Sequence, residues 1–170
     1  MSSHRKFGNN QKVVARPILE TDRPWMDLIS IENWGSNQVV SRGRVHNILH
    51  LPGFIAEKEG VRSGFITYHM ENLECEIVTL NSLVPGEGIG SRLVDAVKSC
   101  PQILDCSRIW LITTNDNTHA IRFYHLIGFS IKAIYPNEVN ESRKLKPKIP
   151  LIGNDGIPIR DEIELEHILK

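Results

Sequence analysis

The sequence predicts an α/β fold whose central part is a run of antiparallel strands. Two observations lead to this fold class. Apolar residues recur with helical spacing in three segments, and between the first two of these lie three consecutive strand-like runs joined by short turns. The chain has 170 residues, 41% of them hydrophobic and 24% charged, which suits one ordinary globular domain. We expect a disordered tail over residues 1–12 and a single domain over residues 13–170.

The first half predicts one helix and four strands. Thr21 or Asp22 caps the helix, which has Pro24 in its first turn and ends near Asn33. Residues 38–50 show no clean period, so we interpret them as a mobile segment on the substrate side. The strands are expected over residues 13–18, 54–58, 64–70 and 75–80.

The second half predicts two helices and three further strands. A glycine-rich turn at residues 85–90 leads into the first helix, and Gly128 ends the second. Residues 136–158 are expected to form a long loop. The helices are expected over residues 89–99 and 117–127, and the strands over residues 109–114, 129–135 and 159–168.

Composition excludes several classes of protein. The 20 Lys and Arg balance the 20 Asp and Glu, so the broad basic field of a general nucleic-acid or membrane-surface binder is missing. No apolar run is long enough to span a bilayer, and no apolar segment follows the basic N-terminus. Cys75, Cys100 and Cys106 form no C-x-x-C pair and indicate buried or idle thiols in a reducing compartment. We expect a cytoplasmic protein with a small ligand.

The glycine-rich turn predicts an anion site. Gly86, Gly88 and Gly90 stand where a strand passes into a helix, and unpaired N–H groups at a helix start favour a phosphate. The turn lacks the Gly-Lys-Ser/Thr of a nucleotide-triphosphate loop. Its G-x-G-x-G spacing in mid-chain also differs from the G-x-G-x-x-G of a Rossmann unit. The glycines can also serve the turn alone.

Two motifs resemble the GNAT superfamily of N-acetyltransferases over residues 13–135. Gly88-Ile89-Gly90 matches the end of the acetyl-CoA signature [Q/R]-x-x-G-x-[G/A], although Pro85 replaces the Gln or Arg. The second match is a strand, Asn117, a helix that carries Tyr124, and Gly128-Phe129. The resemblance implies the GNAT fold: a mixed, mostly antiparallel sheet of about six to seven strands with about four helices, splayed between the fourth and fifth strands.

The resemblance also implies acetyl-CoA as co-substrate and a reaction without a metal. The acetyl group passes to a primary amine by direct attack in a ternary complex. The amine belongs to a small molecule or a peptide, and both a monomer and a homodimer stay open. The residues expected to bind the cofactor are Asn81, Ser82, Leu83, Gly86, Glu87, Gly88, Ile89, Gly90, Ser91, Asn117 and Tyr124.

Two catalytic residues follow from the same resemblance, each with an alternative. Tyr124 matches the general acid that protonates the departing sulfur, but its spacing also suits a core aromatic. Glu76 is the best-placed base, acting directly or through water. Strand alternation puts Glu76 on one side with Glu74, Val78 and Leu80, so it can instead sit at a solvated strand end.

Other features are less specific. Trp34, Ser41 and Arg42 lie where the family shapes its acceptor site, and Trp34 can equally be a core aromatic at the end of a helix. His46 and His50 have the spacing of a metal pair, but Asn47 replaces the expected Glu, so surface or substrate-side histidines are the interpretation. A non-catalytic acyl-CoA-binding or sensing module is the alternative function, and a nucleotide-binding regulatory domain is a third.

Overall fold

A seven-stranded mixed sheet forms the centre of the protein, in the order β1-β4-β5-β6-β7-β9-β8. The computed structural model describes residues 12–170, so the predicted tail lies outside the described residues except for Lys12. The strands of this sheet are β1 (Val13–Pro17), β4 (Gly53–Lys58), β5 (Val61–Glu71), β6 (Glu74–Ser82), β7 (Arg108–Thr114), β8 (Ser130–Tyr135) and β9 (Glu162–Ile168).

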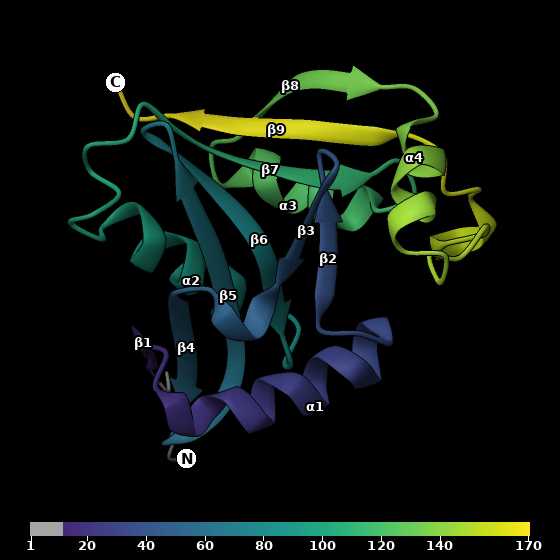
Figure 1. Cartoon of the computed structure of the whole chain (residues 1–170). Helices are drawn as coiled ribbons and strands as arrows, with labels where there is room; N and C mark the ends of the chain where they lie inside the picture. The colour runs from purple at the N-terminus through teal and green to yellow at the C-terminus, as the bar shows by residue number, and fades with distance from the viewer. Residues whose placement is uncertain (1–11) are drawn as a thin grey trace, which may run out of the picture.

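The helices cover the two faces of the sheet (Figure 1). One core packs α2 and α3 against the strands, with Leu93 of α2, Tyr124 of α3 and Ile66 of β5 among its buried residues. The other face carries α1, whose Met26 packs with Phe65 of β5. The helices are α1 (Arg23–Trp34), α2 (Ile89–Lys98), α3 (Thr118–Leu126) and α4 (Glu138–Leu145), and the short 3₁₀ turns are Glu20–Asp22, Ile48–His50 and Asn154–Gly156.

Helix α1 is tied to the sheet by a buried ion cluster rather than capped by its Asp side chain. Asp22 stands at the N-cap position but makes no side-chain cap bond. Its fully buried carboxylate instead accepts hydrogen bonds from Arg16 of β1 and Arg62 of β5. These bonds hold the pKa of Asp22 well below its usual range. The cluster therefore fixes the start of the helix that carries Trp34 at its other end.

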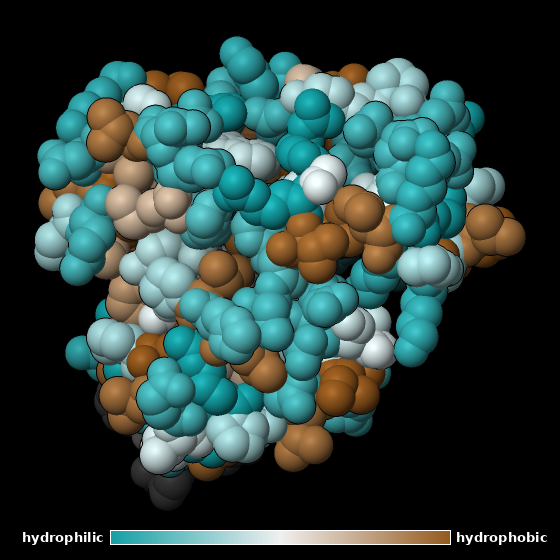
Figure 2. All heavy atoms as spheres, viewed as in Figure 1, coloured by the Kyte–Doolittle hydropathy of each residue, from teal (hydrophilic) through white to brown (hydrophobic). Residues whose placement is uncertain are grey.

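Residues 38–50, expected to be mobile, form a β-hairpin and then a 3₁₀ turn. Strands β2 (Gln38–Ser41) and β3 (Arg44–Asn47) pair antiparallel. Arg42 and Gly43 both have positive φ, as a two-residue type I′ turn requires. The expectation was wrong because four-residue strands are too short to show a period. Figure 2 shows this side of the molecule as mainly hydrophilic, with several hydrophobic patches. Met26 of α1 and Val39 of the hairpin pack toward the sheet. Leu28 and Ile31 of α1 and Val45 of the hairpin are exposed.

The prediction of a long loop over residues 136–158 was also wrong in part. The segment contains α4, of which Val139 and Ser142 are buried. Val139 and Leu145 are its only apolar side chains, so the sequence shows no helical stripe of the usual width. Within the described residues, no helix is long and apolar enough to cross a membrane. Cys75, Cys100 and Cys106 are free and buried, as the sequence suggests.

The sheet opens between β6 and β7, the fourth and fifth strands of the seven-stranded sheet. The two strands pair in parallel only where Glu74, Cys75 and Glu76 lie opposite residues 108–110. Beyond Glu76 they diverge, so both continue without pairing to each other. The implied splay is therefore present.

A β-bulge in β6 changes the predicted alternation of side chains. The pairing of β5 with β6 shifts between Thr67 and Tyr68, which leaves Val78 as the extra residue. Glu76 and Val78 consequently face the hairpin, whereas Leu80 packs into the core on the opposite face. The expectation that Glu74, Glu76, Val78 and Leu80 share one side was wrong at Leu80.

Candidate active site

A cleft of about 860 Å³ occupies the gap between β6 and β7. Residues 77–80 of β6 and 111–114 of β7 form its two strand walls, and α2 and α3 contribute the rest. This volume falls within the range of small-molecule and cofactor sites, about 300–1,000 Å³. The divergence of two neighbouring strands therefore produces the space for a ligand inside the sheet itself.

The start of α2 closes one end of the cleft. Gly88 is its N-cap with φ +73°, a conformation that L side chains rarely adopt. No side chain caps the first turn, so its N–H groups have no side-chain acceptor. The residues of this turn, Ile89, Gly90 and Ser91, line the cleft. A Cβ on Gly90 would lie 3.1 Å from Cζ of Phe123, so this glycine lets α2 approach α3. The turn can hold an anion at the helix start.

The structure brings only some of the predicted cofactor residues to the cleft. Those that line it are Ser82, Gly86, Gly88, Ile89, Gly90, Ser91, Asn117 and Tyr124. Asn81, Leu83 and Glu87 are not among the lining residues. The carboxylate of Glu87 lies 2.6 Å from Nζ of Lys58.

Strand geometry explains the arrangement in β6. The N–H of Leu83 donates to the carbonyl of Ser63, at 2.9 Å, so it points toward the β5 side. Backbone groups alternate along a strand, and those of Leu80 and Ser82 therefore point away from β5. Leu80, which the sequence analysis did not single out, lines the cleft together with Ser82.

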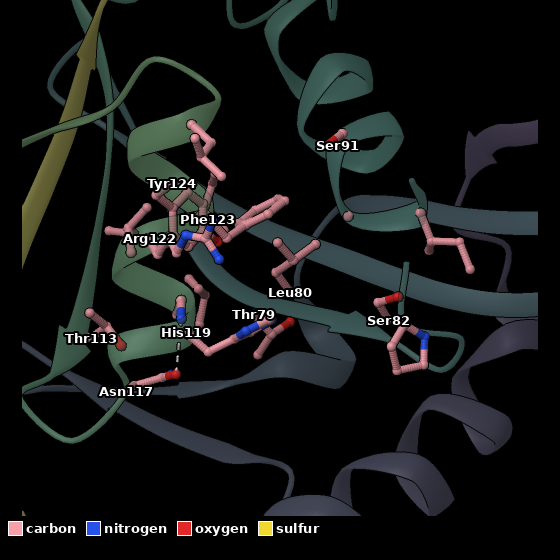
Figure 3. A pocket seen from close by; sticks show the side chains of 18 of the residues that line it. Thr79, Leu80, Ser82, Ser91, Thr113, Asn117, His119, Arg122, Phe123 and Tyr124 are labelled. Atoms are coloured by element: carbon pink, nitrogen blue, oxygen red, sulfur yellow. Dashed lines mark hydrogen bonds between the residues drawn. The ribbon is translucent and has the colours of Figure 1, made fainter. Parts of the chain in front are cut away.

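Helix α3 presents a stripe of side chains to the cleft (Figure 3). His119, Arg122 and Phe123 point into it, and the Asn117 side chain accepts a hydrogen bond from the N–H of Ala120, at 3.2 Å, at the helix start. The spacing of 119, 122, 123 and 126 is that of one helical face, a signal that the sequence contains. The sequence analysis missed this stripe.

Tyr124 is 5% exposed and still lines the cleft. Its ring makes edge contacts with Phe123 and Phe129, at centroid distances of 5.0 and 5.2 Å. Its hydroxyl makes no hydrogen bond with any residue in the described range 12–170. Unlike the unpaired oxygen of Glu76, it is not among the fully buried atoms. Burial raises the pKa of this hydroxyl, which therefore stays protonated at neutral pH and can donate a proton.

Glu76 lies under the hairpin, not at a solvated strand end. It is buried and does not line the cleft, although Val78 on the same side of β6 does. One carboxylate oxygen is 3.3 Å from Nε2 of His46. Burial raises the pKa of Glu76 and lowers that of His46. The interpretation of His46 as a surface histidine was wrong, because β3 turns its side chain inward. The other interpretation, a histidine on the substrate side, stays a prediction.

Trp34 and Arg42 lie at different places. Trp34, the last residue of α1, lines the cleft and makes an edge contact with Phe65. Arg42 in the hairpin turn stacks on Tyr135, 3.6 Å from the ring centroid, and does not line the cleft. Nowhere in the described part of the chain do three or more His, Cys, Asp or Glu side chains gather in a way that holds a metal ion.

Solved acetyltransferases share this fold. The IAA acetyltransferase from Bacillus cereus ATCC 14579 matches with a TM-score of 0.71 and 19% identity over 93% of this chain and 100% of that one. A GNAT family acetyltransferase from Elizabethkingia anophelis with acetyl-CoA bound matches with a TM-score of 0.64 and 18% identity. The match covers 95% of this chain and 99% of that one. At these identities the likeness shows the fold, and the predicted GNAT fold is confirmed.

The chain belongs to the acetyltransferase (GNAT) family of enzymes, because the model of that family matches residues 22–129, more than half of its length. It is also similar to "Uncharacterized protein YdhI" of Bacillus subtilis (strain 168). The two chains are 39% identical over 139 residues, which cover 81% of this chain and 87% of that protein.

Proposed function

We propose that this protein moves an acetyl group from acetyl-CoA to a primary amine by direct attack in a ternary complex. The observation that carries the proposal is the cleft between β6 and β7, which joins an uncapped helix start to the unbonded hydroxyl of a buried tyrosine, Tyr124. A thioester that carries a phosphate group can place its phosphate at the helix start and its thioester beside the tyrosine hydroxyl. The acetyl-CoA in the Elizabethkingia anophelis structure of the same fold supports the choice of cofactor.

The cofactor takes its place along the strand and the helix start. The N–H groups around Gly86, Gly88 and Ser91 hold the pyrophosphate. The pantetheine arm lies along β6 and bonds the outward backbone groups near Ser82, while Asn117 shapes the start of α3. Asn81, Leu83 and Glu87, proposed from the sequence, support this wall from the side away from the cleft.

Amide formation requires a neutral amine and a proton for the leaving thiolate. Glu76 takes the proton from the acceptor ammonium through water, because its carboxylate does not line the cleft. The amine nitrogen attacks the thioester carbonyl, the carbon–sulfur bond breaks, and the Tyr124 hydroxyl donates its proton to the departing sulfur. The positively charged nitrogen then loses its second proton, which returns to the Tyr124 oxygen directly or through water and leaves the neutral amide. The acceptor enters on the side of Trp34 and the hairpin, where Arg42 shapes the outer part of the site.

The first test is binding and turnover with the full chain. Acetyl-CoA or CoA at about 100 times its Kd raises the melting temperature by roughly 5 to 10 °C, whereas NAD and ATP at the same concentration leave it unchanged. A panel of small amines and peptides then reports turnover through free thiol. A larger shift with ATP or NAD, or none with CoA, contradicts the proposal.

A second test separates the turn from the anion site. Asn tolerates positive φ, so Gly88→Asn keeps the turn but adds a side chain where backbone approaches phosphate. Gly60→Asn is the matched control, since Gly60 also has positive φ with open space but lies outside the cleft. Both variants lower the melting temperature slightly, and only Gly88→Asn weakens CoA binding, by roughly tenfold or more. Equal CoA affinities in the two variants would refute the phosphate role.

Two observations favour a non-catalytic acyl-CoA-binding module as the second candidate. Glu76 does not line the cleft, and Pro85 removes an N–H from the turn. Such a module binds CoA with the same thermal shift but releases no thiol with any amine. The turnover panel therefore distinguishes the two functions.

A further inference from the structure

Three buried polar side chains meet between the hairpin and β6. Ser41 of β2, His46 of β3 and Glu76 of β6 are each 5% exposed. Ser41 Oγ, His46 Nε2 and Glu76 Oε1 have no hydrogen-bond partner among the described residues. Unpaired buried polar atoms are costly, and a cluster of them needs an explanation beyond packing.

The cluster adjoins the cleft. Val39 lies opposite His46 in the hairpin, and Val78 follows Glu76 on the same side of β6. Both valines line the cleft. An acceptor amine in the cleft is therefore separated from Glu76 by one layer of side chains.

His46 and Glu76 are close without being aligned. Nε2 of His46 lies 3.3 Å from Oε2 of Glu76, yet makes no hydrogen bond of standard geometry within residues 12–170. The Ser41 hydroxyl offsets part of the rise in the pKa of Glu76, although its own geometry falls short of a hydrogen bond. A small movement of the ring is enough to let a proton pass between the two groups.

Burial and the neighbouring charged groups bring the pKa values of His46 and Glu76 toward each other. Burial is the largest cause on both sides: it raises the pKa of Glu76 and lowers that of His46. His69 and Arg44 lower the pKa of His46 further, while Glu71 opposes them. Arg44 lowers the pKa of Glu76, and Glu164 and Glu71 raise it. A proton passes between two groups at a lower cost when their pKa values lie closer together.

We propose that His46 acts through Glu76 as a positioning residue that accepts the proton of the acceptor amine after Glu76 has taken it. The ammonium first gives a proton, through a bridging water, to the Glu76 carboxylate, which does not itself line the cleft, and becomes the neutral amine. The resulting carboxylic acid passes this proton to the lone pair on Nε2 of His46, which carries its other proton on Nδ1. Glu76 is thereby an anion again, and the imidazolium, disfavoured by Arg44, loses its proton to solvent. This inference rests on the proposed function.

A titration tests the pair independently of turnover. The pKa of His46 is measured by NMR in the full wild-type chain and in Glu76→Gln. Loss of the carboxylate lowers the pKa of His46 by roughly one unit, and the wild-type curve shows a second inflection where Glu76 titrates. An unchanged pKa together with a single inflection overturns the inference, whatever amine the enzyme uses.

Kinetics test the role itself. His46→Gln lowers kcat/KM by roughly 10- to 100-fold for strongly basic amines and leaves CoA affinity unchanged. The loss shrinks for weakly basic amines, which are already neutral at the assay pH. His50→Gln is the matched control, because His50 is exposed and four residues away, and it behaves as wild type.

The remaining outcomes are also decisive. An equal loss with both kinds of amine, or no loss, shows that His46 only packs the hairpin and overturns the inference. If wild type turns over no amine, the proposed function fails, while the titration still decides whether the pair is coupled. If His46→Gln does not fold by circular dichroism, the wild-type and Glu76→Gln titrations carry the test.

Discussion

Replacing Glu76 with Gln is expected to lower kcat/KM for the acceptor amine by roughly 100- to 10,000-fold, the range that a general base contributes. Gln keeps the size of the side chain and its hydrogen-bonding capacity but accepts no proton at neutral pH. Because burial raises the pKa of Glu76, the acidic limb of the wild-type rate profile lies above the ordinary carboxyl range. Activity falls as the pH drops through this pKa, and the limb disappears in Glu76→Gln. Both effects are read from kcat/KM measured across pH.

A second buried carboxylate supplies the control. Glu162 of β9 is also buried, burial raises its pKa, and it accepts a hydrogen bond from Ser142, at 2.6 Å. It does not line the cleft. Glu162→Gln should therefore keep the acidic limb and the activity of wild type. A Glu76→Gln enzyme with the same rate and the same limb as wild type would show that another group or water removes the proton.

Tyr124→Phe is expected to lower kcat by roughly 10- to 1000-fold while the KM for acetyl-CoA changes little. The hydroxyl is protonated, makes no hydrogen bond within the described range 12–170, and borders the cleft, so its removal deprives the leaving thiolate of a proton donor. The measurement is made under conditions where chemistry limits turnover. A kcat within about twofold of wild type would leave Tyr124 as a wall of the cofactor site.

Two controls separate the hydroxyl from the ring. Tyr68 is likewise a buried tyrosine, but its hydroxyl faces Cys100 and it does not line the cleft. Tyr68→Phe should therefore leave kcat intact. Tyr124→Ala removes the ring, which packs between Phe123 and Phe129, and should cost roughly 3 kcal/mol or more of unfolding free energy on either interpretation.

The site was only partly readable from the sequence. Ser82, the glycines of the turn, Asn117, Tyr124 and Trp34 were identified and do line the cleft. Asn81 and Leu83 do not, because a strand alternates its two sides and the sequence does not show which one faces the opening. The bulge at Val78 makes the same point, since one extra residue reverses the side on which Leu80 appears.

The sequence by itself determined the order of helices α1 to α3 and of the strands of the main sheet, the glycine-rich turn and the family, because these depend on local periodicity and on motifs within short stretches of chain. Only the tertiary structure decided what surrounds Glu76. His46 lies thirty residues before it in the chain, on strands too short to show a period, and the two meet because the hairpin folds over β6. Burial and the contacts between distant segments shift pKa values, and both arise from the packing of the whole fold.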